Sequence, residues 1–217
     1  MFKHFHPYEP FIKQDTKTLI MGTLPPPRFC EKDFKLDDVD FCYGSKDNLL
    51  WKLFEKLFDT KLSYNTSQAA VIQRKELLIQ HKIGICDIVE SCYREKIDAS
   101  DIGMCEPIVF RDILGLIEKF KTLETIIFMG GLCKNSPEYF LKKILKPNSI
   151  SYQHISKKEH YFYFDNRKIK TINVTSPSNA ANRAIGANQL YKKNKLKNKS
   201  YSTFDFRIEE YRKVLVN

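Results

Sequence analysis

The sequence lacks the residue patterns that mark metal-binding, secreted and membrane-spanning proteins. Its six cysteines include no CxxC pair, and no Cys/His group has zinc-finger spacing. No apolar run approaches the roughly 20 residues that a membrane helix needs. The first residues, MFKHFHPYEPFIK, have no signal-peptide core. We therefore expect no metal site, no membrane contact and a cytoplasmic protein with reduced thiols, associated with the nucleoid if the source is prokaryotic. His4 and His6 could chelate a metal, but an unstructured N-terminus is the favoured interpretation.

The composition indicates one basic domain. The chain has 217 residues, of which 42% are hydrophobic, and its formal net charge is +10. That content is enough for one sizeable core, so we expect a single domain over residues 1–217, with residues 190–203 as a flexible basic segment. The charge indicates a polyanionic partner, with nucleic acid first and an anionic membrane surface second, although many Lys-rich proteins are merely soluble.

Short apolar runs alternate with helical periodicity along the chain. Strands are predicted at 18–21, 84–89, 125–129 and 170–174, helices at 47–58, 69–82, 109–120, 137–145 and 204–216, and a hairpin at 150–165. This alternation predicts an α/β protein whose parallel sheet is covered on both faces. Ligands of such sheets bind beyond the carboxyl ends of the strands. The loops after Leu24, Ile88, Met129 and Val174 are therefore the candidate site, even though Pro and Gly also punctuate loops that have no function.

Four segments at these strand ends form a recognisable set. They are LIMGTLPP at 19–26, YGSKDNLLW at 43–51, GICDIVESC at 84–92 followed by DASDI at 98–102, and TSPSNA at 175–180. In this order they resemble the motifs of the uracil-DNA glycosylase superfamily, most closely those of its hypoxanthine-DNA glycosylase branch and the related mismatch-specific branch.

The resemblance implies a three-layer α/β/α sandwich around a four-stranded parallel sheet, to which the hairpin and the C-terminal helix would be peripheral. It also implies a monofunctional DNA glycosylase of base-excision repair. Such an enzyme hydrolyses the N-glycosidic bond of a flipped-out deaminated base, here uracil or hypoxanthine. No metal or organic cofactor is implied. The partner would be double-stranded or single-stranded DNA that contains a damaged base, and we expect a monomer.

The matching positions suggest roles for individual residues. Tyr43 would stack on the flipped base, and Asn48 would be catalytic by orienting water or donating to the departing base. Asp87 would accept a base N–H. Each has a plain structural alternative: Tyr43 packing on the helix start, Asp47 and Asn48 capping the helix, and Asp87 orienting its loop. Gly22, Thr23, Leu24 and Ser176 would complete the base pocket, and the predicted DNA contacts are Pro25, Ser178, Asn179, Arg183, Lys192 and Lys193.

The sequence departs from the best-known uracil enzymes at several motif positions. Leu24 stands where they carry Asp or Asn, and Ser176 stands where their last motif begins with His. Ala180 and Ala181 occupy the place of the intercalating Leu, so Arg183 or another loop would have to fill the vacated stack. These departures leave two alternatives open: a nucleic-acid-binding member of the fold with weakened or lost catalysis, and a hydrolase of free nucleosides or nucleotides.

Overall fold

A six-stranded mixed sheet forms the centre of the protein. The computed structural model describes residues 1–131 and 133–216. The strands lie in the order β3-β2-β6-β9-β8-β7, with bounds Ile83–Ile85, Thr18–Met21, Thr125–Met129, Arg167–Val174, Glu159–Phe164 and Gln153–His154. The first four strands run parallel to one another. β8 then pairs antiparallel with β9, and β7 pairs antiparallel with β8. The α/β class is confirmed, but the expected four-stranded parallel sheet is part of a larger mixed one. The hairpin is not peripheral, because β8 pairs with β9 and extends the sheet.

Helices cover both faces of this sheet. Their bounds are Leu50–Leu57 (α1), Gln68–Gln80 (α2), Ile113–Lys119 (α3), Pro137–Leu145 (α4), Asn182–Ala187 (α5), Gln189–Lys197 (α6) and Thr203–Leu215 (α7). Alternate residues of β2 point to opposite faces. Ile20 packs in one core cluster with residues of α1, α2 and α7, while Leu19 and Met21 pack in another with residues of α3 and α4. The layers are therefore helix, sheet, helix.

A second sheet was not predicted. It is antiparallel, in the order β1-β4-β5, with bounds Phe2–Phe5, Val89–Arg94 and Cys105–Phe110. The helix predicted at 109–120 was wrong at its start, because Val109 and Phe110 end β5 and α3 begins at Ile113. The expectation of an unstructured N-terminus was also wrong. His4 lies in β1, is buried, and accepts a hydrogen bond from Nε of Arg94 at 2.7 Å.

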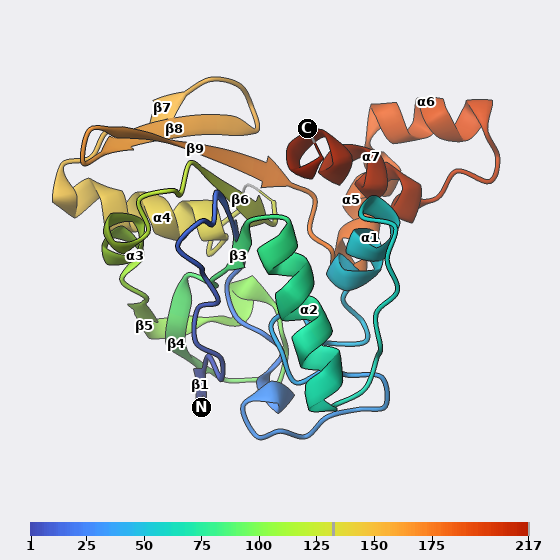
Figure 1. Cartoon of the computed structure of the whole chain (residues 1–217), viewed down its shortest axis with the longest axis horizontal. Coiled ribbons are helices and arrows are strands. Elements are labelled where there is room, and N and C mark those ends of the chain that lie inside the picture. The colour runs from blue at the N-terminus through green and yellow to red at the C-terminus, as the bar shows by residue number, and fades with distance from the viewer. Residues whose placement is uncertain (132, 217) are drawn as a thin grey trace.

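The C-terminal helices gather at one end of the molecule. Figure 1 shows α5, α6 and α7 beside α1, at the end toward which β9 leads. The basic tract lies largely in a helix, since α6 covers Gln189–Lys197 and Asn188 caps it. The flexibility expected for residues 190–203 stays a prediction. Among the described residues, no helix is both long and apolar enough to span a membrane.

Candidate active site

Several predicted site residues lie at the carboxyl edge of the parallel strands. Gly22 follows β2, Asp87 lies just beyond β3, and Ser176 follows β9. Neighbouring parallel strands bring their ends together, and the loops continue this contact because Ile88 N–H donates to the Gly22 carbonyl at 3.0 Å. The structure thus brings the first and third sequence segments into direct contact.

The Asp87 carboxylate is the centre of this contact. Its Oδ1 accepts hydrogen bonds from the Gly22 backbone N–H and from the Tyr43 hydroxyl, both at 2.9 Å. Its Oδ2 lies 3.1 Å from Nε2 of His6. The Asp87 side chain is almost completely buried, so these protein groups replace its hydration. Tyr43 and Asp87 therefore lie together, as a shared base pocket requires, but both carboxylate oxygens already have partners.

His6 is a neighbour of the site that sequence reasoning missed. Its Nδ1 accepts the Tyr8 backbone N–H at 3.1 Å, so the ring proton must sit on Nε2, which donates to Asp87. Burial opposes ionisation of Asp87, but the hydrogen bonds from His6, Tyr43 and Gly22 outweigh it and lower the pKa of the carboxyl. Burial of the Tyr43 hydroxyl, together with the Asp87 charge, raises the pKa of that hydroxyl well above its usual value. At neutral pH the cluster thus holds a carboxylate and a phenol.

The backbone at Tyr43 is forced into an unusual conformation. Tyr43 has φ of 57°, in the left-handed region that is costly for an aromatic residue. Such strain persists only where surrounding contacts over-determine it, and it gathers at functional sites. Gly44 shows how tight the loop is, since an added Cβ there would lie 1.9 Å from the Val39 carbonyl oxygen. A Cβ on Gly22 would lie 2.4 Å from the Tyr43 hydroxyl, so Gly22 is what lets the tyrosine reach Asp87.

Asn48 joins the second segment to the last one. Its Oδ1 accepts the N–H of Leu50, the first residue of α1, at 2.9 Å. The N-cap position is Leu49, which makes no side-chain capping bond, so the expected capping by Asp47 or Asn48 was wrong. The bond to Leu50 uses the amide oxygen and leaves the protons of the amide nitrogen for another partner. Asn48 also forms an antiparallel bridge with Ser178, supported by the bond from Leu49 N–H to the Pro177 carbonyl at 2.9 Å. Asn48 therefore supports the start of α1 through its amide oxygen, and this bond does not use the amide protons.

Arg207 of α7 holds the last segment in place. Its guanidinium donates to the Ser176 carbonyl at 2.9 Å, the Ser178 carbonyl at 2.8 Å and Oδ1 of Asn182 at 2.9 Å. The side chain is fully buried. Sequence reasoning missed this residue. The only signal was a charge on the helix face that also carries Phe204 and Tyr211.

Thr23 contacts a second carboxylate that sequence reasoning did not single out. Its hydroxyl donates to Oδ1 of Asp101 at 2.5 Å. Asp101 begins the short 3₁₀ helix Asp101–Gly103, and its carbonyl accepts Nδ2 of Asn135 at 3.0 Å from the loop between β6 and α4. The signal was the DASDI segment, which the family resemblance matched without assigning a role.

The remaining predicted residues differ in exposure. Leu24 is half-buried against the core and Pro25 is buried, so contact between DNA and Pro25 stays a prediction that the free structure does not favour. Ser178 is half-buried, whereas Asn179 is exposed and its Nδ2 donates to the Asp47 carbonyl at 3.4 Å. The exposed cations lie on the C-terminal helices, with Arg183 on α5 and Lys192 and Lys193 on α6.

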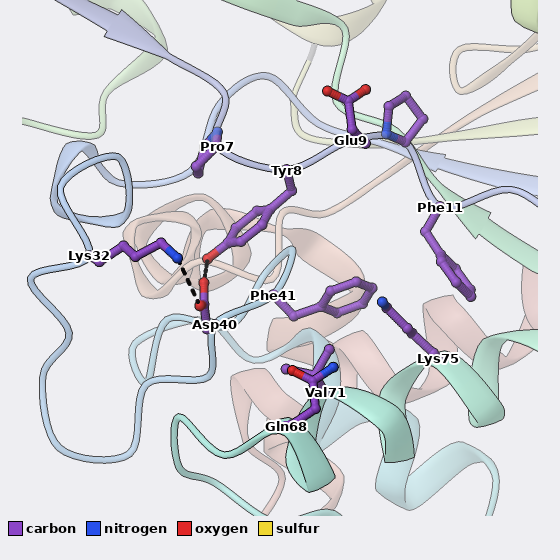
Figure 2. A pocket seen from close by; sticks show the side chains of 11 residues that line it. Pro7, Tyr8, Glu9, Phe11, Lys32, Asp40, Phe41, Gln68, Val71 and Lys75 are labelled. Carbon is purple, nitrogen blue, oxygen red and sulfur yellow. Dashed lines mark hydrogen bonds and ion pairs between the residues drawn. The ribbon is translucent and has the colours of Figure 1, made fainter.

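Two cavities lie away from this edge. One, of about 370 Å³, is lined by the segment Pro7–Phe11, a loop that carries Asp40 and Phe41, and α2. Figure 2 shows Tyr8 donating to Asp40 there and the Lys75 ammonium beside the Phe41 ring. The other, of about 360 Å³, lies at the end of α4. Neither is lined by a predicted site residue.

Fold and site together define an α/β protein with a polar, strained cluster at the strand carboxyl ends. The chain is similar to the solution NMR structure of a "putative Uracil DNA glycosylase" from Methanosarcina acetivorans, with a TM-score of 0.55 and 18% identity. The match covers 96% of this chain and 99% of that one. At this identity the likeness shows the fold alone. No family model matches the chain, and no curated protein matches its sequence.

Proposed function

We propose that the protein is a monofunctional DNA glycosylase that excises a flipped-out deaminated base, uracil or hypoxanthine, in base-excision repair. It would act as a monomer, without a cofactor, on damaged single- or double-stranded DNA. It would work in the cytoplasm, beside the nucleoid if the source is prokaryotic. The observation that carries the proposal is that a single loop contacts two other predicted motifs, Tyr43 bonding Asp87 and Asn48 bridging to Ser178, in a fold similar to that of the Methanosarcina protein.

The chemistry needs few groups. Loss of the base leaves an oxocarbenium-like sugar, which positioning and electrostatics stabilise and water then captures. The free amide protons of Asn48 would donate to negative charge on the departing base or hold the water. The buried negative charge of Asp87 would favour the positive charge that grows on the sugar. Neither group needs to form a covalent bond to the DNA.

A second function is supported by one specific observation. The Tyr43 hydroxyl lies on Asp87 and against Gly22, and Leu24 and Ser176 replace the polar groups of the better-known enzymes. A chain with this arrangement could bind nucleic acid through its basic helices without excising a base. Duplex binding without excision would support this second function.

Asn48→Ala tests the catalytic proposal. Single-turnover excision from a uracil or hypoxanthine duplex should fall by about 100-fold or more, the scale on which a positioned electrostatic donor acts. DNA affinity should change little. Alkaline cleavage of a labelled duplex measures the rate.

Asn48→Ser is the matched control, because a serine hydroxyl can still accept the Leu50 N–H but supplies no amide donor. It should lose excision as Ala does while keeping the parent's stability. A serine variant as fast as the parent would assign Asn48 to its contact with the start of α1 alone.

A further inference from the structure

The Thr23 hydroxyl has a fixed hydrogen-bonding role at the edge of the site. It donates its only proton to Asp101 at 2.5 Å, so its other side presents lone pairs and no donor. Thr23 follows Gly22 directly and is 9% exposed. A hydroxyl in solution can rotate to donate or accept, but this one is held as an acceptor.

Asp101 is placed firmly enough to impose this role. Its carbonyl is tied to Asn135, and Arg94 donates to the neighbouring Ser100 carbonyl at 2.7 Å. Burial raises the pKa of the Asp101 carboxyl, and the Thr23 hydrogen bond and Arg94 offset only part of that rise. The backbone that carries this carboxyl is anchored from the loop after β6 and from β4, independently of Thr23.

Asp87 is poorly suited to the acceptor role at this edge. The Gly22 N–H and the Tyr43 hydroxyl occupy one of its oxygens, and His6 occupies the other. Three of its roughly four acceptor positions are thus filled, and the one that remains lies on a buried oxygen beside His6. Thr23, one residue along from Gly22, has a single bonded partner and keeps its lone pairs.

We propose that the Thr23–Asp101 pair selects bases that present a ring N–H and rejects those that present a ring lone pair. The proposal rests on the proposed function and deepens it by naming the feature that is read. Deamination creates this feature in both candidate substrates: uracil has N3–H where cytosine has a bare N3, and hypoxanthine has N1–H where adenine has a bare N1. An enforced acceptor binds the former and repels the latter, so a single contact serves both a pyrimidine and a purine.

The first test measures base choice during excision. Thr23→Val removes the hydroxyl at nearly constant shape and should slow uracil excision by about 10-fold or more, whereas Thr23→Ser keeps the hydroxyl and should retain the parent's rate. In Asp101→Asn the new amide can donate to Thr23, which frees the Thr23 proton to face the base. The preference for uracil over cytosine should then fall by about 10-fold or more. Asp98→Asn is the control, because Asp98 bonds Arg94 and not Thr23.

The second test does not depend on catalysis. The parent and Thr23→Val are titrated with 1-methyluracil and with 1,3-dimethyluracil, which differ only at N3. Binding is followed by the NMR shift of the backbone amide at position 23. We expect the parent to bind 1-methyluracil about 10-fold more tightly than 1,3-dimethyluracil, which is the scale of one hydrogen bond. Thr23→Val should bind both compounds equally weakly.

The outcomes separate the two proposals. Equal binding of the two methylated bases to the parent, or an unchanged preference for uracil in Asp101→Asn, would overturn the Thr23–Asp101 inference and leave glycosylase activity standing. A parent that distinguishes the methylated bases through Thr23 yet excises nothing would keep the inference and overturn the proposed function.

Discussion

Two buried charges of opposite sign each hold loops of the candidate active site. Asp87 collects N–H and O–H donors at the end of β2, while Arg207 collects carbonyl and amide oxygens after β9. In both cases neutral groups, mostly of the loops themselves, supply the contacts. A buried ion is stable only where such dipoles surround it, so each charge fixes the conformation of the loop that solvates it. The anion orders the loops that carry Gly22 and Tyr43, and the cation orders the Ser-Pro loop.

Removing the cation should have the larger effect on stability. Arg207→Met leaves the oxygens of Ser176, Ser178 and Asn182 without their donor, and we expect the free energy of unfolding to fall by about 3 kcal/mol or more. Urea unfolding measures it. Arg212→Met, on the exposed side of the same helix, should stay within about 0.5 kcal/mol of the parent. Equal stability of the two variants would show that the Ser-Pro loop holds itself in place.

Removing the anion should have a smaller effect that depends on pH. In Asp87→Asn one oxygen still accepts, but the amide nitrogen faces the Nε2 proton of His6, so at pH 7 we expect a loss of about 2 kcal/mol. The pKa of Asp87 is lowered by folding. Its stabilisation is therefore fully present above the unfolded pKa of about 3.9 and is lost as the pH falls toward the folded value.

Urea titrations of parent and variant between pH 3 and 7 should show this directly. The stability difference between the two should be constant above pH about 5 and should shrink below pH about 4. Asp37→Asn, at an exposed position, is the control and should show no such trend. A difference that widened on acidification would contradict a lowered pKa.

Local sequence patterns predicted the elements better than the contacts between them. The strands Thr18–Met21 and Thr125–Met129 and the helix Pro137–Leu145 follow from apolar runs, turn residues and a proline in the first helical turn. The second sheet was missed because its strands pair at long range. Val109 and Phe110, at the end of β5, continue the apolar period of α3, so their pattern predicted a helix.

For the candidate site, too, the sequence predicted individual residues better than their contacts. Tyr43 and Asp87 carried a motif and contact each other at the strand ends, and Asn48 carried one and contacts Ser178. Asp101 and Arg207 carried no local signal for the contacts they make, and His6 reaches Asp87 from 81 residues away. Partners of a buried charge are set by tertiary contacts, which periodicity cannot report.

The smallest expected effect is on DNA binding by the basic helix α6. Its charges are solvated, so they do not fix the conformation of a loop as Asp87 and Arg207 do. Lys192, Lys193, Lys195, Lys197 and Lys199 are all exposed, on α6 and just beyond it. Exposed lysines act on DNA as point charges that release counterions and read no sequence. Replacing all five by Gln should weaken binding equally for damaged and undamaged duplexes. It should flatten the salt dependence by up to about 0.9 units of log–log slope for each phosphate that is no longer neutralised.

A salt titration of duplex binding, parent against variant, measures both effects. The preference among bases should persist, because it would be set at the strand ends some distance along the chain from α6. Unchanged slopes would assign the helix to solvent alone. A changed base preference would mean that the basic helix and the buried charges act on the same step. Their different surroundings argue against this. A screened surface charge contributes to the encounter with DNA, whereas a desolvated charge fixes the geometry of the loops around it.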